Sequence, residues 1–151
     1  TLDGIEINID ERECLTVNGA VSNFNTIITN DRVNLINDHQ FEWLGRVDNV
    51  INSGGIKIQS EKVEKAIATR MATFNFSNRY FVSGLPDEKL GERLVLLIEG
   101  KLDEAKKEVI LNNLKTSLSK YYVPKEIINI DQFKKTPTGK IQRKETLKMI
   151  I

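Results

Sequence analysis

The sequence has few of the residues on which covalent cross-linking and many kinds of catalysis depend. Cys14 is its only cysteine and His39 its only histidine. These counts exclude a disulfide framework, a Cys/His zinc site and a Ser-His-Asp triad, and we expect no metal site. No stretch approaches the roughly 18 consecutive apolar residues of a membrane-spanning helix, so we expect no membrane span. A single unpaired thiol is typical of a reducing compartment, and the cytoplasm is the expected location.

The excess of charge of one sign is also small. The sequence has 22 Lys and Arg residues against 21 Asp and Glu residues, so the net charge is only +1. That total conceals a gradient along the chain. Residues 1–44 carry 2 basic and 8 acidic side chains, whereas residues 101–151 carry 12 basic and 6 acidic ones. The asymmetry indicates two bodies with different partners. The sequence opens at Thr1 instead of Met and runs at once into a strand pattern, so we expect a piece of a longer protein.

The first 44 residues alternate apolar and polar side chains. Ile5, Ile7 and Ile9 occupy every second position, which is the pattern of a half-buried strand. Similar short runs, separated by polar turns, continue to Leu44. Residues 1–44 are therefore predicted to form short antiparallel strands and no helix.

From Gly45 onward, strand and helix patterns alternate. Apolar spacing predicts a helix over 60–71 with Ser60 as its N-cap, and a second helix after Asp103. We expect strands at 49–58 with a break at 53–55, at 80–83 and 94–99 on either side of a loop at 85–91, and at 125–130, before a basic loop and a short helix from about Arg143. The predicted fold class is α+β: a small antiparallel β remnant followed by a compact domain in which helices flank a β-sheet.

The junction of these two segments carries the first candidate site. Arg46 and Asp48 place a guanidinium beside a carboxylate, which suits contact with a phosphate or ribose and a pivot in the chain. A surface linker, with nearby glycines that merely allow a bulge, explains the same residues. Asp31 ends a strand, where its carboxylate could accept two hydrogen bonds from a ribose diol or simply close a turn.

The basic loop near the end of the chain carries the second candidate. Pro137 presets a turn and Gly139 permits an unusual backbone angle, so Lys140 would be presented at a loop tip. This arrangement can deliver a cation to an anion. The segment is not a phosphate-binding P-loop, because Lys134 and Ile141 stand where that motif needs a glycine and a Ser or Thr. A solvated basic tail is the alternative.

Taken in order, these segments resemble the adenylate-forming superfamily, which contains acyl-CoA synthetases, luciferases and peptide-synthetase adenylation domains. The resemblance runs from about Ile28 to Leu147 and rests on the segments 45–64, 84–92, 122–124 and 137–143. Within the superfamily, the sequence most resembles the o-succinylbenzoate-CoA ligases of menaquinone biosynthesis.

The resemblance implies an ATP-dependent acid-CoA ligase, in which a carboxylate is adenylated by ATP and then transferred to the CoA thiol with release of AMP. Residues 1–44 would be the end of a large N-terminal domain, 45–49 a hinge, and 50–151 a mobile C-terminal domain. ATP, Mg²⁺ and CoA are implied for the full-length enzyme, together with a small-molecule carboxylate and the missing N-terminal domain. The fragment is expected to bind none of these tightly and to be inactive alone.

The resemblance also assigns roles to residues of this chain. Asp31 matches the residue that binds the ribose hydroxyls, Arg46 one that contacts the nucleotide, and Asp48 the hinge. Lys140 matches the lysine that bridges the acyl carboxylate and the ATP phosphate during adenylation. The residues that match the lining of the CoA pantetheine channel are Ser53, Gly54, Gly55 and Ile56.

Two other functions fit parts of the sequence. The acceptor could be the thiol of a carrier protein instead of free CoA. Alternatively, the basic rear segment could make the chain a binding module for an anionic partner such as nucleic acid. Only Tyr122 and Phe133 among the aromatic residues lie near the basic loop, which is poor interleaving for base stacking, so no nucleic-acid partner is expected.

Overall fold

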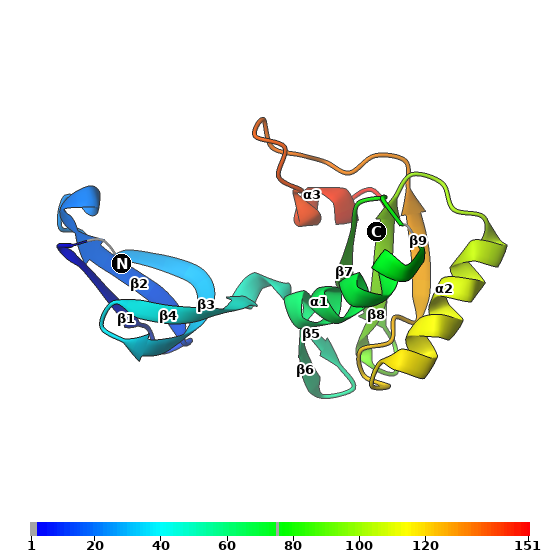
Figure 1. Ribbon diagram of the computed structural model, residues 1–151, viewed down its shortest axis with the longest axis horizontal. Coiled ribbons are helices and arrows are strands. Elements are labelled where there is room, and N and C mark those ends of the chain that lie inside the picture. Colours follow the sequence, from blue (N-terminus) through cyan, green and yellow to red (C-terminus); the bar gives the residue numbers. More distant parts are fainter. Residues whose placement is uncertain (1–2, 75) are drawn as a thin grey trace. The chain divides into compact units, whose positions relative to one another are not determined.

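The computed structural model describes residues 3–74 and 76–151, which form two compact units (Figure 1). The first unit comprises the chain up to Val50 together with Gln59–Lys62. The second comprises Ile51–Ile58 and Val63–Ile151. Each unit has its own sheet and its own hydrophobic core. The hinge expected at residues 45–49 stays a prediction.

The first unit is a four-stranded antiparallel sheet with the strand order β1-β2-β3-β4. Its strands are β1 (Ile5–Ile9), β2 (Cys14–Gly19), β3 (Ile27–Asn37) and β4 (Gln40–Arg46). The predicted absence of helix is wrong by one turn of 3₁₀-helix, Ala20–Ser22. The Ser22 hydroxyl closes this turn, because Oγ lies within hydrogen-bond distance of the Gly19 and Asn25 carbonyl oxygens, at 3.0 and 2.6 Å.

One face of this sheet is apolar, and only its centre is buried. The core consists of Ile7, Leu15 and Val33, and the partly buried Ile5, Val17 and Leu35 pack against it. The strand register extends the same face outward, since Trp43 pairs with Val33 and Phe41 with Leu35. Both aromatic side chains are exposed, Trp43 by 50%. A single layer of strands therefore leaves part of its apolar face uncovered.

The second unit is an α+β domain around a five-stranded sheet with the order β6-β5-β8-β7, in which β9 also pairs with β8. Its strands are β5 (Val50–Ser53), β6 (Ile56–Gln59), β7 (Tyr80–Asp87), β8 (Gly91–Glu99) and β9 (Glu126–Ile130), and its helices are α1 (Ser60–Met71), α2 (Glu104–Ser117) and α3 (Arg143–Leu147). β9 runs parallel to β8, whereas β5 and β7 run antiparallel to it. None of the helices within the described ranges is long and apolar enough to span a membrane.

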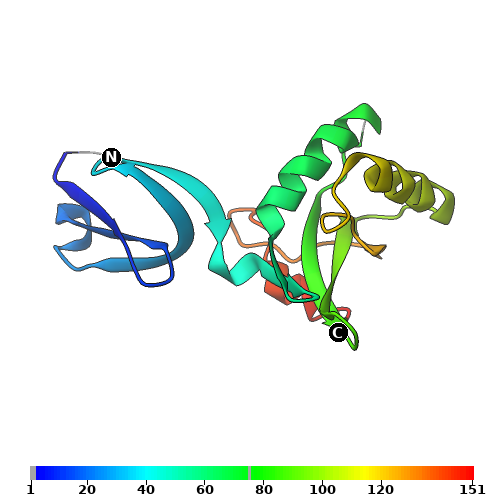
Figure 2. The ribbon, with the colours of Figure 1, turned by 90° about the horizontal axis from the view of Figure 1, so that it is seen from below.

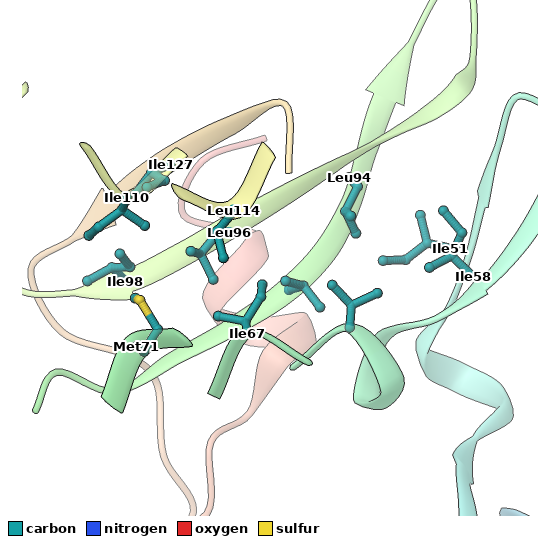
Figure 3. Close-up of a cluster of buried hydrophobic side chains, with 12 residues drawn as sticks. Ile51, Ile58, Ile67, Met71, Leu94, Leu96, Ile98, Ile110, Leu114 and Ile127 are labelled. Atoms are coloured by element: carbon teal, nitrogen blue, oxygen red, sulfur yellow. The ribbon is translucent and has the colours of Figure 1, made fainter. Parts of the chain in front are cut away.

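The central strand β8 is buried on both faces. Leu94, Leu96 and Ile98 point into a cluster that α1 and α2 close (Figure 3). Val95 and Leu97 alternate with them and point to the opposite face, where they pack in a second cluster with Phe81 and Phe133. This second cluster also receives Ile141 and Leu147, from the basic loop and α3. Figure 2 shows α1 and α2 on one side of the sheet and α3 on the other.

The loop predicted over 85–91 is mostly strand, which corrects the sequence interpretation. β7 and β8 continue toward each other through the pairs Leu85–Arg93, Pro86–Glu92 and Asp87–Gly91. Proline is tolerated because β7 lies at the edge of the sheet, where no ladder bond to its missing N–H is required. The Asp87 carboxylate closes the short turn by accepting the N–H groups of Lys89 and Leu90, at 3.0 and 2.9 Å.

The predicted helices are present at the predicted places. α1 spans Ser60–Met71, with Ser60 as its first residue and not as the cap before it. Asp103 caps α2 as predicted, and its carboxylate accepts the N–H of Lys106 at 2.8 Å. This bond from the Lys106 N–H is the main cause that lowers the pKa of Asp103 below its ordinary value. α3 begins at Arg143.

Candidate functional site

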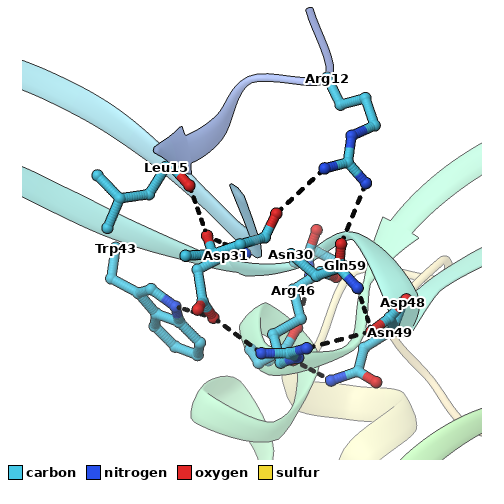
Figure 4. A network of polar contacts seen from close by, with 11 residues as sticks. Arg12, Leu15, Asn30, Asp31, Trp43, Arg46, Asp48, Asn49 and Gln59 are labelled. Carbon is cyan, nitrogen blue, oxygen red and sulfur yellow. Dashed lines mark hydrogen bonds and ion pairs between the residues drawn. The ribbon is translucent and has the colours of Figure 1, made fainter. Parts of the chain in front are cut away.

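Asp31 lies inside β3 and not at the end of a strand, which corrects the sequence interpretation. Asp31 is paired directly with Arg46 in the sheet. Its Oδ1 accepts one hydrogen bond from Trp43 Nε1, at 3.2 Å, and one from Arg46 Nη1, at 3.3 Å (Figure 4). Both bonds converge on one oxygen, and the side chain is only partly buried. Because both donors bind Oδ1, they fix the orientation of the carboxylate. Its second oxygen, Oδ2, can then accept hydrogen bonds from a diol.

The Arg46 guanidinium connects Asp31 to Asp48. Its second amino group, Nη2, lies 3.2 Å from Asp48 Oδ2, and Asn30 Nδ2 donates to the same oxygen at 3.0 Å. Asp31, which the sequence singled out separately, is thus joined to Arg46 and Asp48 in one network (Figure 4). The planar fork of arginine suits this bridge, since its two amino groups point in fixed directions.

The backbone carbonyl group of Arg46 is held by the side chain of Gln59, which also bonds to Glu61. Gln59 Nε2 donates to the Arg46 carbonyl oxygen at 2.8 Å and lies 2.6 Å from Glu61 Oε2. Asn49 Nδ2 donates to the other oxygen of Glu61. Gly45 leaves room for this arrangement, because a Cβ there would lie 2.4 Å from Gln59 Nε2. Its φ of +134° is also one that L side chains rarely adopt.

The segment Ser53–Ile56 is the tip of the β5–β6 hairpin. Gly54 and Gly55 have φ values of +59° and +80°, the left-handed pair that a two-residue hairpin turn requires. Gly54 N–H donates to the Leu90 carbonyl at 2.8 Å, which ties the tip to the β7–β8 turn. A hollow of about 300 Å³ adjoins the tip. It is lined by Ser53, Gly54, Ile56, Ile58, Leu90, Leu94, Lys120, Tyr121, Val123 and Lys125.

Lys140 lies on an exposed hairpin-like loop of the second unit, drawn in orange in Figure 1. Thr136 N–H donates to the Lys140 carbonyl at 2.8 Å, and Lys140 N–H donates to Thr136 Oγ1 at 3.1 Å. Gly139, with φ +81°, closes the turn by donating to the Thr136 carbonyl at 2.8 Å. Lys140 thus has a fixed backbone and an exposed ammonium group, as the sequence predicted for the turn chemistry.

Two cations near Lys140 serve the fold: Lys135 in the basic loop and Arg143 at the start of α3. Lys135 Nζ lies 2.7 Å from Glu99 Oε1, and this hydrogen bond is the main cause that lowers the pKa of the Glu99 carboxyl. Arg143 holds Glu64 in α1 through two contacts, Nη1–Oε1 at 2.8 Å and Nη2–Oε2 at 2.9 Å. The interpretation of this run as a solvated tail is therefore wrong for Lys135 and Arg143.

The candidate residues fall into two groups. Asp31, Arg46 and Asp48 form one network in the first unit, whereas the hairpin tip and Lys140 belong to the second. Sequence reasoning missed Trp43 and Gln59, whose roles depend on the strand register and on the side-chain contacts of the fold. Among residues 3–74 and 76–151, no three His, Cys, Asp or Glu side chains gather as a metal site would require.

The chain matches the family described as the AMP-binding enzyme C-terminal domain over residues 63–140. It belongs to this family. The matched segment ends at Lys140 and includes α1 from Val63 onward, β7–β9 and α2. The α+β fold predicted from the sequence is confirmed by the solved structures that the chain resembles.

The relatives of this AMP-binding C-terminal domain are longer proteins. The chain is 35% identical over 109 residues to 3-oxocholest-4-en-26-oate–CoA ligase of Rhodococcus rhodochrous, covering 68% of this chain and 18% of the relative. It is 41% identical to an acyl-CoA synthetase (AMP-forming)/AMP-acid ligase II-like protein of Dyadobacter fermentans, with a TM-score of 0.68, covering 99% of this chain and 43% of that one.

A more distant structure has the same fold. The o-succinylbenzoate CoA synthetase of Bacillus subtilis is 21% identical, with a TM-score of 0.68, covering 95% of this chain and 34% of that one. The chain spans between 16% and 21% of the length of the first three curated relatives it matches.

Proposed function

We propose that this chain is the C-terminal part of an ATP-dependent acid–thiol ligase. In the first half-reaction a carboxylate oxygen attacks the α-phosphorus of ATP, an O–P bond forms, and pyrophosphate leaves. In the second, a thiol sulfur attacks the acyl carbonyl carbon, a thioester forms, and AMP leaves. The observation that carries this proposal is the exposed Lys140 on a fixed loop tip, in a chain of the AMP-binding C-terminal family.

Lys140 would act in the first half-reaction. The two reactants are both anions, so they repel each other as they approach. An ammonium group between them lowers this repulsion and stabilises the charge that develops at the transferred phosphate. The exposed side chain and the hydrogen bonds of its backbone to Thr136 support this role. Because the loop backbone is already ordered, little conformational entropy is lost when the ammonium group binds the reactants.

The network of the first unit would hold the nucleotide. Asp31 would accept the ribose hydroxyls through its partly exposed carboxylate, and Arg46 would contact the nucleotide from its place between Asp31 and Asp48. Asp48 would be the pivot about which the second unit turns between half-reactions. One rotation can exchange the adenylating residues for those of thioester formation.

The hairpin tip would line the path of the CoA pantetheine arm. Glycine at positions 54 and 55 supports this proposal, since the backbone can come close to a thin ligand where a side chain would obstruct it. The adjoining hollow has an apolar floor at Ile58 and Leu94. Because no three His, Cys, Asp or Glu side chains gather among the described residues, we assign no residue of this chain to the Mg²⁺ that would accompany ATP in the full-length enzyme.

The finer proposals concern substrate, location and the rest of the protein. Sequence resemblance supports o-succinylbenzoate as the carboxylate, and the single cysteine supports a cytoplasmic location. The missing large domain would precede this chain and would cover the exposed apolar face around Phe41 and Trp43. The length of the relatives supports such a domain.

The test uses the longer protein that carries this chain. ATP–pyrophosphate exchange is measured with o-succinylbenzoate, 3-oxocholest-4-en-26-oate and octanoate, and thioester formation is measured from the supplied acyl adenylate with CoA. We expect Lys140→Ala to reduce exchange by about 100-fold or more while thioester formation changes by less than about threefold. The 151-residue chain alone should give no exchange.

Lys148→Ala is the matched control, because Lys148 is an exposed lysine outside the loop and pairs with Glu145. It should leave both half-reactions unchanged. Equal losses in both half-reactions for Lys140→Ala would refute the proposed role of this lysine. Transfer to a carrier protein but not to CoA would correct the proposed acceptor.

A further inference from the structure

The Thr146 hydroxyl lies at the base of the Lys140 loop and contacts both of its arms. Thr146 is fully buried. Its Oγ1 accepts a hydrogen bond from Lys134 N–H and donates one to the Gln142 carbonyl oxygen, both at 3.0 Å. Lys134 enters the loop and Gln142 leaves it, and Gln142 N–H also donates to the Lys134 carbonyl at 2.8 Å. One side chain therefore joins the two ends of the loop.

Only a hydroxyl group can make this pair of contacts from a site of this size. It supplies one donor and accepts through its lone pairs, so it satisfies a carbonyl and an N–H at once. A valine in its place keeps the shape but leaves the Lys134 N–H without its acceptor. The hydroxyl of Thr146 therefore serves the two ends of the loop, with which it forms hydrogen bonds, and not the apolar cluster beneath them.

The base determines which side chains of the loop face outward. Above it the two arms pair through Lys135 and Ile141, and then through Thr136 and Lys140. Ile141 packs against the cluster that contains Phe81, while its neighbour Lys140 is exposed. Because side chains alternate along such a ribbon, a slip of one residue would exchange these two orientations.

The base is itself attached to the body of the second unit. Thr146 lies in α3, whose first residue, Arg143, holds Glu64 of α1 by two contacts. Glu64 Oε1 in turn accepts the N–H of Val82 in β7 at 2.9 Å. The position of the Thr146 hydroxyl is therefore set by the sheet and α1 and not by the loop.

We propose that Thr146 is a positioning residue for Lys140, which fixes the register of the loop arms and so directs the Lys140 ammonium outward. This inference rests on the proposed function for its effect on adenylation. It deepens that function by adding a residue that touches neither substrate nor nucleotide.

The experiment compares Thr146→Val, which removes the hydroxyl, with Thr146→Ser, which keeps it. Thr116→Val is the matched control, since Thr116 in α2 also donates its hydroxyl to a helix carbonyl, that of Asn113. Amide hydrogen exchange is measured on the 151-residue chain by NMR. We expect exchange at Lys134 and at Lys140 to rise by at least about fivefold in Thr146→Val only, as loss of one hydrogen bond implies.

The two half-reactions are then measured in the longer protein with the three carboxylates named above. Thr146→Val should lower kcat for pyrophosphate exchange by about tenfold or more, with thioester formation from supplied adenylate unchanged and Thr146→Ser restoring exchange. Equal losses in both half-reactions, no loss in either, or failure of serine to restore exchange would overturn the inference.

The two proposals fail in distinguishable ways. If Lys140→Ala abolishes exchange but Thr146→Val behaves as the wild type, only the positioning role is refuted. If the wild-type protein activates none of the three carboxylates, the proposed function loses its support. The amide-exchange pattern then decides the role of Thr146 in the loop by itself: unchanged exchange at Lys134 and Lys140 refutes it.

Discussion

Gly45 shows how a single position can determine the geometry of the network formed by Asp31, Arg46 and Asp48. A Cβ at this position would meet Gln59 Nε2 at 2.4 Å and Glu61 Oε2 at 2.7 Å. Gln59 cannot simply swing aside, since it is buried and donates to the Arg46 carbonyl. The glycine is therefore required both by its backbone angle and by the contact behind it.

We predict that Gly45→Ala lowers the free energy of unfolding of the first unit by about 2–4 kcal/mol, from backbone strain and the lost Gln59 bond. Urea unfolding followed by Trp43 fluorescence measures this change. Gly4→Ala is the control, since Gly4 also has a positive φ, +74°, but nothing lies within 4 Å of its Cβ position. Equal effects of the two substitutions would show that the steric contact is unimportant.

The candidate residues were accessible from sequence to very different degrees. Asp31, Arg46 and Lys140 are singled out by local chemistry, because charge, turn residues and spacing are visible along the chain. The role of Thr146 and the pairing of Glu64 with Arg143 are not, because they depend on partners brought close by folding; Glu64 and Arg143 are 79 residues apart. Local patterns identify groups that could react, whereas the residues that hold them depend on tertiary contacts.

At the scale of elements, the end of β8 and the basic loop are tied by Glu99. Its Oε1 accepts the Phe133 N–H at 2.9 Å and lies 2.7 Å from Lys135 Nζ. The contact from Lys135 is the main cause that lowers the Glu99 pKa from an ordinary value of 4.5. A carboxylate whose pKa is lower in the folded than in the unfolded chain stabilises the fold above its unfolded pKa.

We therefore predict that this contribution is present at neutral pH and is lost as the pH falls from about 4.5 through the lower, folded pKa of Glu99. Glu99→Gln should lower the free energy of unfolding at pH 7. It should also make the fall of this free energy below about pH 4.5 less steep. The measurement is the free energy of unfolding of the second unit by circular dichroism between pH 3 and pH 7. Glu88→Gln, in the exposed β7–β8 turn, should keep the wild-type slope; a parallel slope for Glu99→Gln would contradict the assignment.

The elements themselves were predicted well where their pattern is local. α1 spans the predicted residues because its apolar side chains recur at helical spacing, and Asp103 marks the start of α2. β7 and β8 are longer than predicted, since Pro86 and Gly91 signal a turn and the pairing that overrides this signal is not visible locally. The parallel pairing of β9 with β8 is likewise set by packing across the chain.

At the scale of the whole molecule, the two units differ in how much core they have. The described part of the second unit has clusters of 12 and 6 buried residues on the two faces of its sheet. Within residues 3–50 and 59–62, the first has a cluster of 3 on one face of a single-layer sheet. An uncovered sheet of this kind has little apolar burial to offset the entropy of folding.

We predict that urea unfolds the first unit before the second. Trp43 is the only tryptophan and lies in β4, so its fluorescence reports the first unit. Circular dichroism at 222 nm reports α1 and α2, most of which belong to the second. The fluorescence midpoint should fall at a lower urea concentration than the dichroism midpoint; coincident curves would show that the units unfold as one.

The chain crosses between the two units more than once, and this limits how the molecule can be recombined. Gln59–Lys62 belong to the first unit, although Ile51–Ile58 before them and Val63 after them belong to the second. In a fusion made at a single junction after Val50, position 59 would come from the other protein. The hydrogen bond from Gln59 to the Arg46 carbonyl would then depend on a foreign residue. When the second unit is exchanged between enzymes, residues 59–62 must therefore come from the same protein as β4, because Gln59 holds the carbonyl of Arg46 at the end of that strand.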